Sequence, residues 1–155
     1  MNLVEGLSHR PRRNRRSEAI RGLVRETHLL PSHLISPLFV QDGSGSPEPI
    51  ASMPGMARLS ELDLLKEVES SMSLGIHSFV LFPAVEDRLK DATGSYGTSA
   101  ENFYLRLARS VKERFPEAYL MSDVALDPYS SDGHDGIVRD GVVLNDVTLP
   151  ILAKQ

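Results

Sequence analysis

Short apolar runs alternate with amphipathic stretches along the chain. Three runs are rich in β-branched or aromatic residues and have the length of strands: residues 35–40, 78–82 and 118–124. Between them, apolar residues recur three and four positions apart, which is the period of a helix with one buried face. The pattern therefore predicts strands and helices in alternation.

Helical spacing is found in stretches that are bounded by start and stop signals. These stretches cover residues 17–29, 60–74 and 98–114, and a fourth begins near Asn145. The second opens with Ser60-x-x-Asp63 and the third with Thr98-x-x-Glu101, both of which resemble capping boxes. In the first, Ile20, Leu23 and Val24 would form the inner face.

Strands separated by helices of this length predict βαβ units, because parallel neighbours need a long crossover connection. We therefore expect an α/β fold with a parallel sheet. A complete (β/α)₈ barrel needs about 250 residues, and this sequence has 155 residues with three predicted strands. If the fold is a barrel, the chain contains only part of it.

Charge is distributed unevenly along the chain. Residues 1–30 carry a net charge of +4 and residues 31–155 a net charge of −8, and five of the seven residues 10–16 are arginine. Such a basic segment could bind nucleic acid, but no aromatic residue is interleaved for stacking and the acidic remainder would be repelled by phosphate. We expect no nucleic-acid partner. The favoured interpretation is an extended arm over 1–16, solvated or in contact with another subunit, and a barrel-type domain over 17–155.

Composition restricts the class of protein, its expected location and the kinds of metal site it could contain. An apolar fraction of 41% with 25% charged residues is typical of one globular domain. No apolar run approaches a membrane span, and the first residues have the reverse charge order of a secretory signal, so we expect a cytoplasmic protein without a membrane partner. The absence of cysteine excludes disulfides and thiolate zinc sites, so that oxygen or imidazole would have to hold any metal.

Candidate chemistry is concentrated after the third predicted strand. Residues 122–136 contain four carboxylates and one histidine, namely Asp123, Asp127, Asp132, His134 and Asp135. Gly133 and Gly136 allow tight turns that could bring Asp127 and Asp135 together, and two carboxylates at a strand end can hold Mg²⁺ or position an ammonium group. The alternative is that these residues form turns with carboxylates facing water, and spacing alone favours it.

The same segment resembles a known family signature. Asp123-Val124-Ala125-Leu126-Asp127-Pro128-Tyr129, followed by Gly133-His134-Asp135-Gly136, is similar to the metal loop of the porphobilinogen synthases, also called δ-aminolevulinic acid dehydratases. Further motifs support the resemblance in collinear order: Arg10-Pro11-Arg12-Arg13, Ser52-Met53-Pro54-Gly55, Arg58-Leu59-Ser60, Leu81-Phe82-Pro83 and Leu144-Asn145-Asp146. It implies about three β/α units from the amino-terminal part of a (β/α)₈ barrel.

The resemblance also implies a metal preference. Zinc-using members carry cysteines at the positions of Ala125, Asp127 and Asp135, and the exchange to alanine and two carboxylates is similar to the magnesium-type branch. It implies Mg²⁺, or a monovalent cation, in place of zinc. Asp127 and Asp135 would be catalytic and bind the cation, and Asp123 would be a third catalytic residue that supports them through hydrogen bonds.

Family membership would imply the condensation of two 5-aminolevulinate molecules to porphobilinogen with loss of two waters, a step of haem and tetrapyrrole synthesis. The Schiff-base lysines of the family lie in its second half. No catalytic role is expected for the lysines present, Lys66, Lys90, Lys112 and Lys154. The chain alone is thus expected to be inactive, and the complete enzyme to be a homo-octamer in which the arm contacts a neighbouring subunit.

Two alternatives remain. The chain could be a non-catalytic truncated subunit or interaction module that associates with the full-length synthase. It could also belong to a different Schiff-base aldolase-type barrel, which the collinear motifs disfavour.

Overall fold

The computed structural model describes residues 11–155, which fall into two compact units divided after Leu30. In the first unit, η1 spans Pro11–Arg15 and α1 spans Glu18–Leu23, and the Ser17 side chain caps α1 by accepting from Ile20 N at 3.2 Å. The helix starts as predicted but ends six residues early. The predicted inner face is wrong within this unit, since Leu23 and Val24 are exposed at 86% and 47%.

Part of the predicted arm, residues 1–10, lies outside the described residues. The boundary expected at residue 16 stays a prediction. In the described part of the chain, the change from one compact unit to the next falls between Leu30 and Pro31.

The second unit is built on a five-stranded sheet with the order β2-β3-β1-β4-β5. Its strands are β1 (Ile35–Gln41), β2 (Glu48–Pro49), β3 (Ala57–Leu59), β4 (Ser78–Ala84) and β5 (Tyr119–Ser122). β4 pairs in parallel with β1 on one side and β5 on the other, which confirms the α/β fold and the three predicted strands. β3 adds a short parallel pairing at the other edge of β1, and β2 runs antiparallel to β3.

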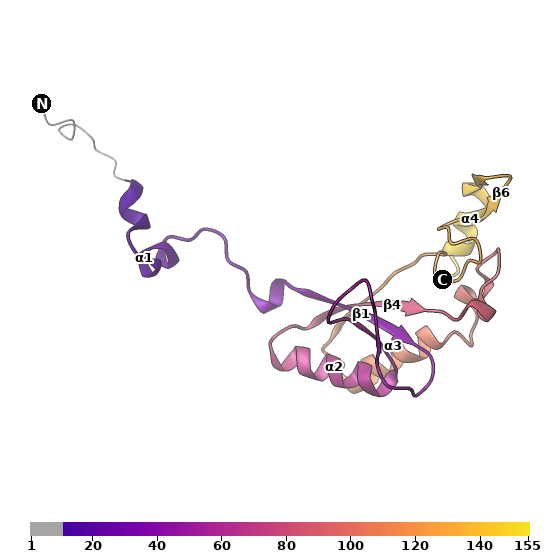
Figure 1. Ribbon diagram of the computed structural model, residues 1–155, viewed down its shortest axis with the longest axis horizontal. Coiled ribbons are helices and arrows are strands. Elements are labelled where there is room, and N and C mark those ends of the chain that lie inside the picture. The colour runs from indigo at the N-terminus through magenta and orange to yellow at the C-terminus, as the bar shows by residue number, and fades with distance from the viewer. Residues whose placement is uncertain (1–10) are drawn as a thin grey trace, which may run out of the picture. The chain divides into compact units, whose positions relative to one another are not determined.

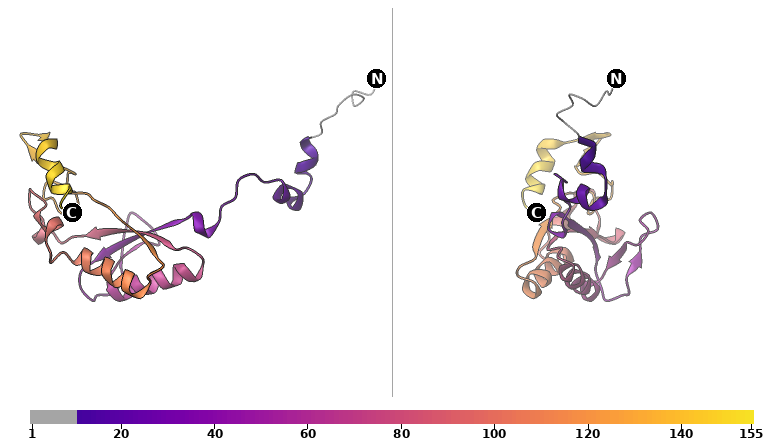
Figure 2. Two further views of the ribbon diagram at one scale, coloured as in Figure 1. Left: turned by 180° about the vertical axis from the view of Figure 1, so that it is seen from behind. Right: turned by 90° about the vertical axis from the view of Figure 1, so that its left-hand side faces the viewer.

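Two helices, α2 (Glu61–Ser73) and α3 (Phe103–Arg114), pack side by side over one face of the sheet (Figures 1 and 2). Their apolar stripes follow the predicted spacing. Fully buried side chains from both helices meet the inward-facing strand residues, forming a core of Leu38, Val40, Leu64, Val68, Phe79, Leu81, Leu107 and Val111. Burial of this stripe, more than intrinsic propensity, holds the helices in place.

Both predicted capping boxes differ from the structure. Ser60 precedes α2, but its hydroxyl donates to Gly45 O at 3.0 Å and contacts Asp63 Oδ2 at 3.4 Å instead of accepting from the helix. The start predicted near residue 98 is wrong: residues Ser95–Thr98 form the 3-10 helix η4, and α3 begins after Asn102, whose Oδ1 accepts from Tyr104 N at 3.1 Å. Asparagine is among the strongest N-caps.

The other face of the sheet carries a different set of side chains. Phe39 and Phe82 are paired in register and stack with ring centroids 5.5 Å apart, and Arg58 is paired with Phe39 on the neighbouring strand. At the sheet edge, Tyr119 of β5 is 65% exposed. Parallel sheets are normally covered on both faces, so this face and the β5 edge are the surfaces that the rest of a barrel would cover.

The chain after β5 gathers at the carboxyl ends of β1 and β4 (Figure 1). There the hairpin strands β6 (Val138–Arg139) and β7 (Val142–Val143) precede α4 (Asn145–Leu152), whose start agrees with the prediction. Two more 3-10 helices are η2 (Pro31–His33) and η3 (Asp87–Leu89). No helix in residues 11–155 is long and apolar enough to cross a membrane.

Candidate active site

A tight turn after β5 displays Asp127. The amides of Tyr129 and Ser130 both donate to Leu126 O, at 2.9 and 2.8 Å. Leu126 and Tyr129 are buried at 1% and 4% exposure, whereas Asp127 between them is exposed. Two buried anchors therefore hold the turn and leave the Asp127 carboxyl group on its outer side.

Tyr129 is held by the neighbouring elements. Asn102 Nδ2 donates to its hydroxyl at 3.1 Å, and this asparagine, the cap of α3, is only 2% exposed. The Asp91 amide donates to Tyr129 O at 3.2 Å, and Ser131 N donates to Asp91 O at 3.0 Å. The Tyr96 ring packs against that of Tyr129, with centroids 6.2 Å apart. The position of Asp127 thus depends on the loop after β4 and on the start of α3.

The loop after β4 is itself organised around the Asp91 carboxylate. It accepts from Thr93 N and Thr93 Oγ1, both at 2.7 Å, from Ser95 N at 3.2 Å, and from the Ser95 hydroxyl. These bonds favour the charged form and hold the pKa of Asp91 well below its usual range. Sequence analysis indicated only a polar loop here, although the bond from the Thr93 amide to Asp91 is the pattern of an Asx turn.

Asp127 and Asp135 come together in the structure. Their carboxyl groups interact: the pKa of Asp127 is raised first by partial burial of its carboxyl group, then by hydrogen bonding with Asp135 and by the negative charge of that residue. The charge of Asp123 raises it further. Asp135 and Asp123 therefore both act on Asp127 in the chain that follows β5. The catalytic and cation-binding roles of the three carboxylates stay predictions.

Asp123 is placed by Tyr104 of α3. The Tyr104 hydroxyl donates to Leu81 O at 3.1 Å, and the Asp123 amide acts as a hydrogen-bond donor toward the Tyr104 hydroxyl oxygen. Burial of this side chain, which is 6% exposed, raises the pKa of Tyr104 to about 12. The tyrosine therefore stays neutral at physiological pH and ties the ends of β4 and β5 together.

The donor set restricts which metal could be held. Within residues 11–155, no group of three or more His, Cys, Asp or Glu side chains is placed to hold a metal ion. The available donors are the oxygens of Asp127 and Asp135. Two carboxylates fit Mg²⁺, which prefers oxygen and keeps several of its own waters, and do not fit a structural zinc site.

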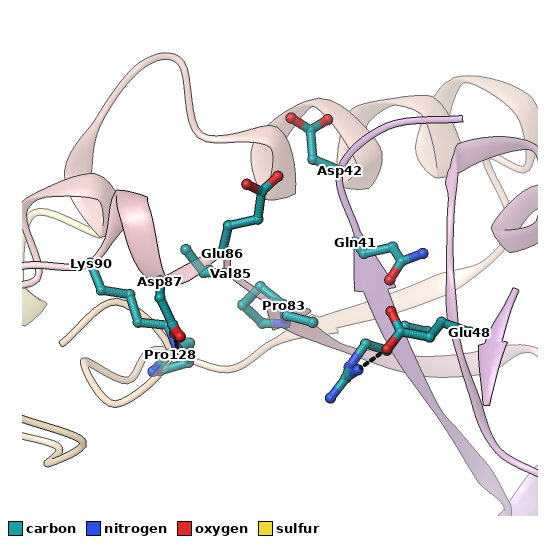
Figure 3. A pocket seen from close by; sticks show the side chains of 11 residues that line it. Gln41, Asp42, Glu48, Pro83, Val85, Glu86, Asp87, Lys90 and Pro128 are labelled. Carbon is teal, nitrogen blue, oxygen red and sulfur yellow. Dashed lines mark hydrogen bonds and ion pairs between the residues drawn. The ribbon is translucent and has the colours of Figure 1, made fainter. Parts of the chain in front are cut away.

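A pocket of about 580 Å³ lies beside the carboxylate turn, at the carboxyl ends of β1 and β4 (Figure 3). Pro128 of the turn lines it near Lys90, whose ammonium group pairs with Asp87 at 2.8 Å. On the other side, Glu48 pairs with Arg58 at 2.7 Å. The pocket therefore presents both signs of charge to a bound molecule.

Sequence analysis did not predict these lining residues. Gln41 ends β1 and Asp42 follows it, and Glu86 and Asp87 follow β4. The rule that parallel strands carry functional groups at their carboxyl ends applies to each of the three strands. Applied to the first two strands, the rule would have identified these residues. It also indicates Lys90, which lies in the loop after β4, as a residue of the site.

Comparison with known proteins decides the family. A family model described as Delta-aminolevulinic acid dehydratase matches residues 8–155. The chain belongs to the delta-aminolevulinic acid dehydratase family. Among its relatives, the delta-aminolevulinic acid dehydratase of Chlamydia pneumoniae is 48% identical over 148 residues, covering 96% of this chain and 45% of that protein. The chloroplastic delta-aminolevulinic acid dehydratase of Hordeum vulgare is 49% identical over 151 residues, covering 96% of this chain and 35% of that protein.

A solved dehydratase shares the fold. The crystal structure of the delta-aminolevulinic acid dehydratase (porphobilinogen synthase) from Toxoplasma gondii, in complex with the reaction product porphobilinogen, matches with a TM-score of 0.91 at 48% identity. The match covers 97% of this chain and 43% of that one. The chain thus spans less than half the length of these dehydratases, and its α/β unit corresponds to part of their barrel.

Proposed function

We propose that this chain supplies the amino-terminal part of a porphobilinogen synthase, which condenses two molecules of 5-aminolevulinate to porphobilinogen with loss of two waters. The observation that carries the proposal is the Asp127–Asp135 pair at the end of β5, in a chain of the dehydratase family. The product bound in the Toxoplasma gondii relative supports the reaction.

Each part of the site has a role in this proposal. The 5-aminolevulinate molecule carries an ammonium group, a ketone and a carboxylate. Asp127 and Asp135 accept hydrogen bonds from the ammonium group, whose positive charge would offset the repulsion by Asp135 that helps to raise the pKa of Asp127. Asp123 adds negative charge behind them. The adjoining pocket has room for the rest of the substrate, with Arg58 and Lys90 as partners for a carboxylate.

We further propose Mg²⁺, or a monovalent cation, as an alternative occupant of the Asp127–Asp135 pair. A bound cation would neutralise the repulsion between the two carboxylates. The lysines that form Schiff bases with the ketone are expected in the second half of the family's barrel. Lys90 is held as an ion pair with Asp87 and is assigned to binding.

The first test is a porphobilinogen colour assay on the purified chain with 5-aminolevulinate, with and without Mg²⁺. No pyrrole is expected. Pyrrole formation would mean that a lysine of this chain is catalytic, which would contradict the proposal that the Schiff-base lysines lie in the second half of the barrel.

The second test uses a complete synthase that contains this segment. Asp127→Ala and Asp135→Ala are each expected to lower turnover strongly with the fold intact, because both residues lie on an exposed loop. Asp132→Ala, an exposed carboxylate of the same loop, is the matched control. Wild-type turnover in the Asp127→Ala or the Asp135→Ala variant would show that the assignment of these residues to the active site is wrong.

The assembly and location follow as proposals from the resemblance. In the complete enzyme, a homo-octamer, the arginine-rich residues 1–16 would contact a neighbouring subunit. The cytoplasmic location stays a proposal, since some relatives, including that of Hordeum vulgare, are chloroplastic.

A further inference from the structure

Thr148 is a buried polar residue in the middle of α4, with 4% exposure. Its hydroxyl donates to Leu144 O at 2.8 Å and accepts from Ile137 N at 3.0 Å. Ile137 follows Asp135 by two positions. The hydroxyl therefore ties the helix directly to the backbone that carries one of the paired carboxylates.

The backbone beside Asp135 packs closely against the same helix. A Cβ atom at Gly136 would lie 2.5 Å from Val143 Cγ1 and 3.0 Å from Thr148 Oγ1. Leu144 N donates to Ile137 O at 2.8 Å and completes the attachment. These contacts restrict movement of the Asp135 turn relative to α4.

The end of the same helical segment reaches the other carboxylate's loop. Gln155 Nε2 donates to Ala125 O at 3.1 Å, two positions before Asp127. The same amide group packs on η4, where a Cβ atom at Gly97 would lie 2.4 Å from Gln155 Nε2. One helical segment thus contacts the chain on both sides of the Asp127–Asp135 pair.

We propose that Thr148 and Gln155 are positioning residues that set the separation of the Asp127 and Asp135 carboxyl groups. Thr148 of α4 holds the Asp135 side, and Gln155, three residues beyond the end of α4, holds the Asp127 side. Neither touches substrate. Their importance for turnover rests on the function proposed above, whereas the separation itself is a property of the fold.

The test uses the absence of native cysteine from the chain. Asp127→Cys combined with Asp135→Cys places two thiols where the carboxyl groups meet. Their disulfide equilibrium with glutathione measures the effective concentration of one thiol at the other. Adding Thr148→Val, which removes the hydroxyl but keeps the shape, is expected to lower this value by about fivefold or more, the scale of one lost buried hydrogen bond.

Companion variants separate positioning from general packing. Thr148→Ser keeps the hydroxyl and is expected to restore the effective concentration, and Gln155→Ala is expected to lower it as Thr148→Val does. Leu149→Ala changes the next, 61% exposed position of α4 and is expected to have no effect.

The proposal is overturned if the two thiols do not form a disulfide in the folded chain. It is equally overturned if Thr148→Val and Gln155→Ala both match the parent pair, or if Leu149→Ala lowers the value as much as they do. Should Thr148→Val fail to fold, Gln155→Ala and Thr148→Ser still decide. No turnover is measured, so a failure of the synthase assignment would be seen separately in the pyrrole assay.

Discussion

At the scale of single residues, two aspartates of the same unit respond to pH in opposite directions. The carboxyl group of Asp127 retains its proton to a higher pH than a free aspartate, because partial burial and its neighbours Asp135 and Asp123 disfavour the charge. The carboxylate of Asp91 is surrounded by hydroxyl and amide donors that favour the charge. The two groups therefore make contributions of opposite sign to the free energy of unfolding.

Asp135→Asn tests the first contribution. Between the ordinary and the raised pKa of Asp127, the folded chain binds more protons than the unfolded chain, so this group's contribution to stability falls as pH rises through that interval. We expect the variant to lower the pKa of Asp127 and to raise the free energy of unfolding at pH 7 by no more than about 1 kcal/mol, because solvent screens an exposed pair.

Urea unfolding between pH 4 and 8, with a carboxyl-carbon NMR titration, measures both quantities. Asp132→Asn, on the same loop, serves as the control. An unchanged pKa for Asp127 in the Asp135 variant would show that the two carboxyl groups are not coupled.

Asp91→Asn tests the second contribution. The folded pKa lies below the ordinary value of 3.8, so the stability it provides is present above that value and is lost as pH falls through it toward the folded pKa. We expect the variant to lower the free energy of unfolding at pH 7 by about 1 kcal/mol, since a charged acceptor is replaced by a weaker one.

The loss should become smaller in acid, because the parent chain loses the contribution of Asp91 as pH falls below the ordinary value toward the folded pKa. Urea unfolding at pH 7 and near pH 2 compares the two conditions. An equal loss at both would assign the effect to packing instead of charge.

Residues of the site could be predicted where a sequence motif groups them, but not where only the fold brings them together. Asp127 and Asp135 were candidates because Gly133 between them and Gly136 after them permit turns, and the two carboxyl groups interact in the structure. Asn102 and Thr148 were not, because a buried asparagine or threonine has no signature in spacing. Their partners, Tyr129 and Ile137, lie 27 and 11 positions away in the chain.

At the scale of elements, hydrophobic period located the strands and helices but not their ends. The predicted ends of β1 and β4 lie within two residues of the observed ends. The hairpin β6–β7 was missed because two-residue strands are too short to show a period. The start of α3 was misplaced because Thr98-x-x-Glu101 resembles a capping box, whereas Asn102 caps the helix in the structure.

Asn102→Ala, compared with Thr98→Ala, distinguishes the two candidate caps. Asn102 caps α3 and also bonds to Tyr129, so its loss is expected to cost about 1–2 kcal/mol of unfolding free energy. Thr98 is exposed and outside α3, and its loss should cost less than about 0.5 kcal/mol. Equal costs in urea unfolding would contradict the observed helix start.

At the scale of the whole second unit, the sheet has one covered face and one free parallel edge. Unpaired parallel strands with apolar neighbours tend to associate. β5 occupies that edge, and Tyr119 on it is 65% exposed. The chain is therefore expected to self-associate, or to bind a complementing barrel segment, through β5.

Tyr119→Lys tests this edge. The added charge is expected to shift the chain toward a monomer, because a lysine on an edge strand opposes further pairing. Light scattering over a concentration series measures the change. Leu149→Lys adds a charge at a comparably exposed position of α4 and should leave association unaltered. If both variants behave alike, net charge and not the edge controls association.

The order of strands in the sheet has a further consequence, for the way the chain is made. β1, β4 and β5 occur in the same order along the sequence and across the sheet. Between β1 and β4, the chain first adds β3 and β2 on the other side of β1. β4 and then β5 can each add to the edge left by the previous strand of this series as the polypeptide leaves the ribosome. Such vectorial growth leaves the most recent of these three strands exposed at one edge of the sheet during synthesis, and a chaperone could protect that edge.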